Sequence, residues 1–339
     1  MKKRMLFIIN MKSGKGQMNH NALSVIDCFI KYGYEVRVHI TQGERDATRL
    51  LAKEGMTYDL IAVSGGDGTL NEAVSGLMKG KLSLPILYLP AGSTNDFARS
   101  LAIPSDPHEA LKSCLEGKAF QCDVGGFLAP GDGKGGRDFT RNFVYVAAFG
   151  AFTEVSYDTP QNLKNTFGHS AYLMRALQSI PKIKPMHLQI EYGKEKIEGE
   201  FLYGMITNSH SVGGLIKLES ERISLSDGVF EVTLIMNPNN PPELTQMLID
   251  LAQQNETSTK FIYRLQTDRI RICSEEAIPW TIDGENGGEH REVILENIHH
   301  GITILVPEEE AIRLEQREES TKEFVKEEME EQNETGNWK

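Results

Sequence analysis

The first part of the chain alternates short apolar runs with stretches of helical periodicity. The apolar runs 4–9, 60–63 and 85–90 have the length and the branched or leucine-rich character of buried strands. Apolar residues recur at helical spacing in the segments 22–32, 47–54, 71–78 and 107–116. This alternation is typical of βαβ units, and it predicts a three-layer α/β domain.

The pattern changes after about residue 125. From there on, short segments of strand character are separated by turn residues. These segments are 142–148, 187–192, 200–207, 228–236, 269–273 and 301–306. The pattern predicts a second domain with a mostly antiparallel β-sandwich. A glycine-rich loop at 131–136 interrupts it, and we assign this loop no role.

Composition and charge narrow the class of protein. A chain of 339 residues with 40% hydrophobic and 25% charged residues is typical of a two-domain globular protein. The four cysteines show no C-x-x-C spacing, so a zinc or redox motif is not expected. The net charge is −12, and residues 308–339 carry 12 Glu against 5 Lys or Arg, or −7 of it. This balance argues against nucleic-acid binding.

No segment has the character of a membrane anchor or a secretory leader. The basic residues 2–4 are followed by only five apolar residues, 5–9, which is short for a signal peptide. No apolar run reaches the roughly 18 residues that span a bilayer. We therefore expect a cytoplasmic protein.

A glycine-rich turn links the run 60–63 to the helical segment 71–78. It reads S-G-G-D-G-T over residues 64–69. Glycines allow the backbone to approach a ligand closely, and the N–H groups at the start of the next helix favour phosphate. Asp67 would repel phosphate unless a cation lay between them, so the turn implies Mg²⁺. A tight turn with a surface Asp explains this motif, taken alone, equally well.

Two further turns follow buried runs in the same way. The segment 91–96, A-G-S-T-N-D, follows the run 85–90. In a parallel sheet both turns lie at the carboxyl ends of strands, where such folds bind ligands. Helix capping accounts for one of the polar residues in this segment, but not for three beside a second Asp. The segment 10–16 follows the run 4–9 and is similar to a P-loop in composition, although the P-loop spacing is absent.

Together the three turns resemble the catalytic domain of the diacylglycerol kinase family, which includes bacterial soluble lipid kinases and sphingosine kinases. The family pattern G-G-D-G-T-x-N-E is intact at 65–72, and P-x-G-T-x-N-D is matched at 90–96 with Ser93 in the threonine position. The pattern N-P-x-S-G is matched at 10–14, except that Met11 replaces proline. The serine keeps the hydroxyl, and Met11 loosens one turn without removing a ligand.

The resemblance covers roughly residues 3–307 and implies an ATP-dependent lipid kinase, with diacylglycerol as the first candidate acceptor. It implies that the ATP phosphates lie over the turns 65–69 and 10–14 and that three carboxylates hold Mg²⁺, some through water. The expected metal ligands are Asp67, Asp96 and Asp123. The expected nucleotide-binding residues are Asn10, Met11, Lys12, Ser13, Gly14, Thr41, Gly65, Gly66, Asp67, Gly68, Thr69, Leu70, Asn71, Glu72, Gly92, Ser93 and Asn95.

Phosphoryl transfer to a hydroxyl also needs a base. The family motif D-G-E is matched at Asp283, Gly284 and Glu285. In a strand the two carboxylates would share a face, and in a turn they could converge. A plain Asp-Gly hairpin turn explains the residues equally well. The resemblance favours Glu285 as the base, and we include Asp283 and Asp67 among the catalytic candidates.

Some further expectations come from the resemblance. A structural Mg²⁺ is expected at the backbone carbonyls of Ser224 and Val229 and the side chain of Asp227. In the family, the chain after the β domain returns to the first domain. We therefore predict a nucleotide-binding domain of residues 1–125 and 307–325, a lipid-substrate domain of residues 126–306, and an acidic tail of residues 326–339.

The substrate implies a partner surface. A membrane lipid as acceptor requires transient contact with the inner face of the membrane, and we leave a homodimer open. The segment 162–184 mixes apolar with basic residues and is the predicted docking surface on an anionic membrane. A helix packed in the core is the usual explanation of an apolar stripe.

Two rival functions use the same glycine-rich turn. NAD kinases carry a G-G-D-G turn, as phosphofructokinases do. An NAD kinase would lack the residues Asn-Asp-Phe at 95–97, which continue the third motif, and the D-G-E motif. A non-catalytic nucleotide-sensing module would fit better if Asp67 or Glu285 were missing, and both are present. We therefore rank a lipid kinase first.

Overall fold

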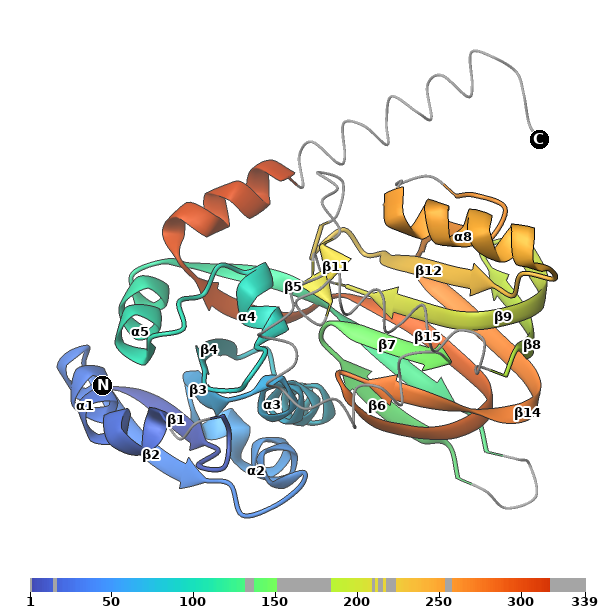
Figure 1. Cartoon of the computed structure of the whole chain (residues 1–339). Helices are drawn as coiled ribbons and strands as arrows, with labels where there is room; N and C mark the ends of the chain where they lie inside the picture. Colours follow the sequence, from blue (N-terminus) through green and yellow to red (C-terminus); the bar gives the residue numbers. More distant parts are fainter. Residues whose placement is uncertain are drawn as a thin grey trace, which may run out of the picture. The chain divides into compact units, whose positions relative to one another are not determined.

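The chain folds into two compact units in a computed structural model (Figure 1). The described residues are 2–14, 17–131, 137–150, 184–208, 211–212, 216–217, 224–253 and 258–317. Unit 1 comprises the described residues among 1–123, 209–227 and 299–317, and unit 2 those among 124–208 and 228–298. The predicted docking segment lies outside the described residues except for Lys184, as do the acidic tail and most of the loop 131–136.

Unit 1 contains a parallel sheet. Its strands are β1 (Lys3–Ile9), β2 (Tyr34–Ile40), β3 (Leu60–Gly65), β4 (Pro85–Pro90) and the last part of β15 (Glu285–Val306). They are ordered β15-β4-β3-β1-β2, and each neighbouring pair is parallel. The predicted apolar runs form the buried strands β1, β3 and β4, because continuous apolar stretches suit strands covered on both faces.

Helices connect these strands. They are α1 (Gln17–Lys31), α2 (Asp46–Glu54), the 3₁₀ helix η1 (Gly55–Thr57), α3 (Asp67–Gly80), α4 (Asp96–Ser100) and α5 (Pro107–Leu115). The start of α5 is set by Asp106, whose side chain accepts the N–H groups of His108 and Glu109, while Pro107 opens the first turn. The α/β character predicted for this part is confirmed, and the three-layer arrangement stays a prediction.

Unit 1 also includes a small hairpin, a long strand and a terminal helix. The hairpin joins β10 (Ser211–Val212) to β11 (Ile216–Lys217), and β10 packs against α4. The strand β5 (Lys118–Ala129) pairs with β15 and begins in unit 1. Residues 308–317 are helical and belong to unit 1.

Unit 2 is rich in antiparallel strands. They are β6 (Phe139–Phe143), β7 (Val146–Gly150), β8 (Met186–Tyr192), β9 (Glu195–Thr207), β12 (Phe230–Met236), β13 (Ile262–Thr267) and β14 (Arg269–Ile282), with parts of β5 and β15. The long strands β9 and β14 each pair with β8 along one half and with β7 along the other. The strand-rich character predicted for this part is confirmed.

An aromatic cluster fills the core of unit 2. The indole of Trp280 is packed between Phe127, whose ring centroid is 5.2 Å away, and Phe149, at 4.9 Å. All three side chains are buried, and they gather aliphatic residues from β8, β9, β12 and β15 around them. Burying large aromatic side chains contributes strongly to the stability of such a core.

The structure differs from the predicted elements in several places, and the strands β2, β5 and β13 were not predicted. The predicted strand 142–148 is two strands, because the N–H groups of residues 144–146 donate to a side chain instead of a neighbouring strand. The helix α8 (Pro241–Gln253) was not predicted. Its signal is a capping box: Asn240 accepts the N–H of Glu243, and Glu243 accepts the N–H of Asn239.

A further difference concerns the ends of the units. The described residues among 209–227 and residues 299–306, which we predicted in the β-rich domain, group with unit 1. For residues 299–306 the reason is the length of β15, which is 22 residues long and joins the parallel sheet with its last part. The turn residues in its sequence had indicated shorter strands.

Gly204 on β9 tests the packing of the aromatic core. A Cβ atom there would lie 2.2 Å from the ring of Phe149, which is fully buried and cannot move away freely. We expect Gly204→Ala to lower the free energy of unfolding by about 1–3 kcal/mol, the usual cost of overpacking. Chemical denaturation followed by tryptophan fluorescence would measure this change.

Gly199→Ala on the same strand is the matched control. Its Cβ would approach the flexible end of Met236 at 3.0 Å and would lie at ordinary contact distance, 3.9 Å, from the ring of Phe201, so we expect a change below about 0.5 kcal/mol. Equal effects of the two substitutions would contradict the assignment of Phe149 as the obstacle.

Candidate active site

The three glycine-containing turns of unit 1 lie against one another. The N–H of Asn10 donates to the carbonyl of Ser64 at 2.9 Å, and the N–H of Ala91 donates to the carbonyl of Gly65 at 2.8 Å. The N–H of Gly66 donates to the hydroxyl of Ser13 at 3.3 Å. The strand order of the sheet thus brings together the turns that the sequence singled out.

Close backbone contact explains the glycines. A Cβ on Gly92 would lie 2.6 Å from the Cα of Gly66, so the two turns touch where neither has a side chain. Gly14 has a φ of +56°, and a Cβ there would lie 2.2 Å from the carbonyl oxygen of Ala91. Only glycine combines this conformation with this contact.

Polar side chains fix the turns. The side-chain amide of Asn10 donates to the hydroxyl of Thr69 at 3.0 Å. The side-chain oxygen of Asn10 accepts the N–H of Lys12 at 3.0 Å, so the first turn is closed without the proline that Met11 replaces. Asn95 closes the third turn by exchanging two hydrogen bonds with the backbone of Gly92. Although Asn95 is the residue before α4, its side chain does not cap that helix.

The helix α3 begins within the second turn. It starts at Asp67, four residues earlier than predicted, and Gly66 precedes its first turn. The N-terminus of a helix of this length carries N–H groups and a partial positive charge that favour anions. Leu70 and Asn71, which we predicted to bind nucleotide, are buried in this helix. Gly68, Ser93 and Lys12 retain exposed surface.

Two of the predicted metal ligands lie together. The carboxylate of Asp67 accepts the N–H of Asp96 at 3.2 Å and that of Phe97 at 3.4 Å, and both aspartates are buried. Burial raises the pKa of the Tyr88 phenol well above its usual value, and the charges of Asp67 and Asp96 add to this. Tyr88 therefore stays protonated and donates to the carbonyl of Gly65 at 3.2 Å.

The donor set fits Mg²⁺, which prefers carboxylate oxygen. Asp123, the third predicted ligand, contacts His299 and His300. In the part of the chain that the structure describes, Asp67, Asp96 and Asp123 do not form a group with all ligand atoms within 4.8 Å. An ion shared by all three would reach some of them through water, as the sequence led us to expect, and these roles stay predictions.

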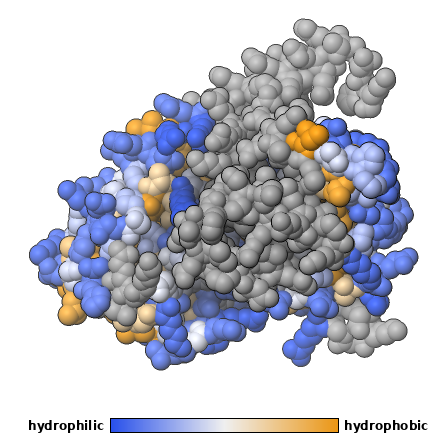
Figure 2. Space-filling model, in the orientation of Figure 1, coloured by the Kyte–Doolittle hydropathy of each residue, from blue (hydrophilic) through white to orange (hydrophobic). Residues whose placement is uncertain are grey.

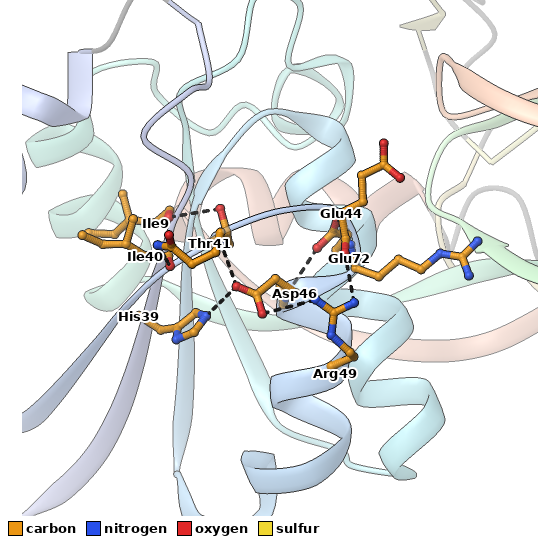
Figure 3. Close-up of polar contacts among 11 residues, drawn as sticks. Ile9, His39, Ile40, Thr41, Glu44, Asp46, Arg49 and Glu72 are labelled. Atoms are coloured by element: carbon orange, nitrogen blue, oxygen red, sulfur yellow. Dashed lines mark hydrogen bonds and ion pairs between the residues drawn. The ribbon is translucent and has the colours of Figure 1, made fainter.

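Glu72 holds the loop that follows β2. Its carboxylate accepts the N–H of Arg45 at 2.7 Å and that of Ala47 at 3.2 Å, at the start of α2 (Figure 3). Its backbone carbonyl accepts the hydroxyl of Thr48. We predicted Glu72 as a nucleotide ligand. In the structure, its carboxylate oxygens accept hydrogen bonds from the backbone of this loop, which begins at Thr41.

A second carboxylate closes the same loop from within. Asp46 accepts the N–H of Gln42 at 2.9 Å and contacts a ring nitrogen of His39 at 3.0 Å (Figure 3). The hydrogen bond from Gln42 lowers the pKa of Asp46 below its usual value, and His39 acts in the same direction. Thr41 donates its N–H to the carbonyl of Ile9, which ties the loop to β1.

In unit 2, the candidate carboxylates Asp283 and Glu285 have different surroundings. Asp283 and Gly284 both have positive φ and form the two-residue hairpin turn between β14 and β15. The carboxylate of Asp283 is buried and accepts the N–H groups of Val144, Tyr145 and Val146 at 2.9–3.1 Å. It therefore fixes the turn between β6 and β7.

Glu285 is exposed and forms an ion pair with Arg141 on β6. The guanidinium of Arg141 also donates to the carbonyl of Asn286 at 3.2 Å, so it contacts the hairpin at both Glu285 and Asn286. Sequence reasoning missed Arg141. Its partner lies 144 residues away, and the only local signal is its place on a strand that pairs with β5.

The residues of the predicted structural metal site are in part engaged. The carbonyl of Val229 accepts the side-chain amide of Asn297 at 3.0 Å. Ser224 is buried, and its hydroxyl accepts the N–H of Ser226. Asp227 is half-buried. The metal role of these residues stays a prediction.

Comparison with known proteins identifies the family. Residues 4–127 match the family described as diacylglycerol kinase catalytic domain, and residues 148–301 match the YegS C-terminal NAD kinase beta sandwich-like domain. The diacylglycerol kinase of Bacillus subtilis (strain 168) is 30% identical over 92% of this chain and 99% of its own length. That of Staphylococcus aureus (strain bovine RF122 / ET3-1) is 32% identical over 91% of this chain and 93% of its own length.

The chain belongs to the diacylglycerol kinase family. It is therefore a lipid kinase, a phosphotransferase, and the resemblance seen in the motifs is confirmed.

Solved structures show which proteins share the fold of the lipid kinase. A diacylglycerol kinase from Bacillus anthracis str. Sterne has a TM-score of 0.67 at 21% identity, covering 90% of this chain and 97% of that one. Yeast NADH kinase complexed with NADH has a TM-score of 0.52 at 13% identity, covering 92% of this chain and 85% of that one. The NADH kinase thus shares the overall fold of the lipid kinase.

The surface that Figure 2 shows agrees with the 25% of charged residues in the sequence. Among the described residues, no helix has the length and apolar character needed to cross a membrane. Hydrophilic residues cover most of the coloured surface in Figure 2, with apolar residues scattered among them. The cytoplasmic location stays a prediction.

Glu72→Ala tests how the lipid kinase holds its loop. Alanine favours helix, so α3 should persist while both hydrogen bonds to the loop are lost. A hydrogen bond to a charged group is worth about 1.5–3 kcal/mol, so we expect the hydrogen-exchange protection of the Arg45 and Ala47 amides to fall at least about 10-fold. Amide exchange measured by NMR would show this.

Glu44→Ala is the control, because the Glu44 side chain extends away from these contacts in Figure 3. Unchanged protection of Arg45 and Ala47 in Glu72→Ala would contradict the holding role.

Proposed function

We propose that this lipid kinase transfers the γ-phosphoryl group of Mg·ATP to the hydroxyl of diacylglycerol and so forms phosphatidic acid. The observation that carries the proposal is the match over nearly the full chain to relatives named diacylglycerol kinase, with both units included. The interlocked turns of unit 1 and the D-G-E hairpin of unit 2 support it.

The nucleotide phosphates would bind at the three turns of unit 1. The N-terminus of α3 and the hydroxyl of Ser13 supply donors and positive potential there. Because Asn10, Thr69 and Asn95 are tied to the turns by hydrogen bonds, these donors are held in place before the nucleotide arrives. Phosphoryl transfer depends on such positioning more than on covalent chemistry by the protein.

Asp67 and Asp96 are the residues that would hold Mg²⁺. Their burial makes the negative charge costly without a cation, which favours occupancy when nucleotide is bound. Held by these two carboxylates, Mg²⁺ would supply positive charge to neutralise the charge that develops on the transferred group. Asp67 also accepts two N–H groups at the start of α4, so its carboxylate is oriented by the third turn.

Glu285 would accept the proton of the lipid hydroxyl. It is the exposed carboxylate of the D-G-E hairpin, and Asp283 beneath it is engaged in holding the turn at residues 144–146. Arg141 would fix the orientation of Glu285 until the acceptor binds. The lipid substrate calls for transient contact with the inner face of the membrane, which we propose as the site of action, with a homodimer left open.

A labelled-ATP assay against lipids in mixed micelles tests the function, with NAD as the soluble control. We expect diacylglycerol to be phosphorylated and Asp67→Ala to lower the rate at least about 100-fold, as for the loss of one preorganised charge stabiliser. Asp27→Ala, on the exposed face of α1, should leave the rate unchanged.

Phosphorylation of NAD and of no lipid would replace the proposal with the NAD kinase alternative. Near-normal turnover by Asp67→Ala would remove the metal role of Asp67.

Glu285→Gln separates the base from nucleotide binding. We expect ATP affinity to stay within about twofold and the transfer rate to fall about 100-fold or more, as is typical for the loss of a general base. Isothermal titration with ATP and the micelle assay measure the two quantities. Glu289→Gln on the same strand is the control, since Glu289 is also exposed. Weakened ATP binding with a normal transfer rate would show that Glu285 acts on the nucleotide and not on the lipid acceptor.

A further inference from the structure

Two consecutive histidines lie side by side where β15 enters unit 1. The rings of His299 and His300 are stacked, with centroids 3.7 Å apart and planes inclined by 28°. In a regular strand, successive side chains point to opposite faces. His300 has a φ of +53°, and this left-handed conformation breaks the alternation. Both imidazoles therefore face the same surroundings.

A buried carboxylate faces this pair. Asp123 is fully buried, and one of its oxygens accepts both the Nδ1–H of His299 at 2.9 Å and the backbone N–H of His300 at 2.8 Å. The N–H of Asp123 donates to the carbonyl of Leu225 at 2.8 Å, which fixes β5 at this point. One ligand atom from each of Asp123, His299 and His300 lies within 4.8 Å of the others.

The three side chains have the chemistry and the access of a metal site. The His299 side chain is 52% exposed, and His300 is also exposed, so an ion can reach the nitrogens from solvent. Two imidazoles with one carboxylate are a typical donor set for Zn²⁺ and related ions, whereas Mg²⁺ prefers oxygen alone. This donor set shares Asp123 with the predicted Mg²⁺ ligands, and its two imidazoles distinguish it from the all-oxygen set of Asp67 and Asp96.

We propose that Asp123, His299 and His300 form a binding site for a divalent cation of the Zn²⁺ class, with water in the fourth position. On binding, the Nδ1 proton of His299 moves through solvent to Nε2, and the Nδ1 lone pair that this exposes takes the ion. The left-handed backbone of His300 costs free energy. A shared ion compensates for this cost, because that conformation places the two imidazoles on the same side.

The hydrogen bonds that the Asp123 carboxylate accepts also hold this geometry without an ion. The experiment must therefore distinguish a metal site from a purely structural contact. The test uses the metal alone and no substrate, and its result does not depend on the proposed kinase function. The His variants are chosen because the side chains are exposed. Asn tolerates the left-handed conformation needed at position 300, so His300→Asn should fold.

The experiment is a titration of the metal-free full chain with Co²⁺ and Zn²⁺ in the presence of a large excess of Mg²⁺. We expect one saturable site, with the intense visible absorption of tetrahedral Co²⁺, and displacement of Co²⁺ by Zn²⁺. His299→Asn and His300→Asn should each weaken Co²⁺ affinity at least about 10-fold, because even supporting residues of metal sites contribute that much.

His187→Asn is the matched control. This histidine also contacts two carboxylates, Glu198 and Glu200, and is half exposed, but its two nitrogens face different partners. It should leave the affinity unchanged. Thermal unfolding of each variant checks that the chain is folded.

Three results would overturn the proposal. They are the absence of saturable Co²⁺ binding, full competition by Mg²⁺, and unchanged affinity in both folded His299→Asn and His300→Asn.

Discussion

Backbone contact between the second and third turns is the constraint on which the candidate site depends. Gly66 and Gly92 meet where no side chain fits, and Gly14 brings the first turn against Ala91 in the same manner. The contact sets where α3 and α4 begin, and so directs Asp67 toward the N–H groups of residues 96 and 97. Asn10, Thr69 and Asn95 then lock the turns with side-chain hydrogen bonds. The acidic and the anion-binding features of the site thus share one origin, the absence of three side chains.

Much of the fold could be predicted because the signals are local. The buried strands of unit 1 are continuous apolar runs, and α5 follows an Asp-Pro start that caps and opens a helix. The lengths of β5, β14 and β15 could not be predicted, since turn residues such as Gly126 and Gly287 occur inside these strands. There the pairing of long neighbours outweighs local preference. The helix α8 was missed although its Asn240–Glu243 capping box is visible in the sequence.

The same distinction between local signals and long-range contacts applies to the candidate site. The turns and their glycines were predicted, and the structure brings them together. The contact partners of single side chains were not predicted, because these partners lie far away along the chain. Glu285 meets Arg141 across 144 residues, and Asp123 meets His299 across 176. Glu72 lies within a family motif, yet its carboxylate is directed to the backbone of the loop that follows β2, a distinction that no spacing in the motif conveys.

The continuity of β15 has a consequence for how the protein is made. The chain leaves unit 1 through β5, contributes the described residues among 209–227 to unit 1, and returns to it finally through β15, so both parts of unit 2 lie within the sequence of unit 1. On the ribosome, the strand that pairs with β4 emerges only after every strand of unit 2 has been synthesised. Until then the edge of β4 that β15 covers is unpaired, and exposed strand edges promote aggregation. Closing the parallel sheet is a late step of folding, with the high contact order that slows such steps.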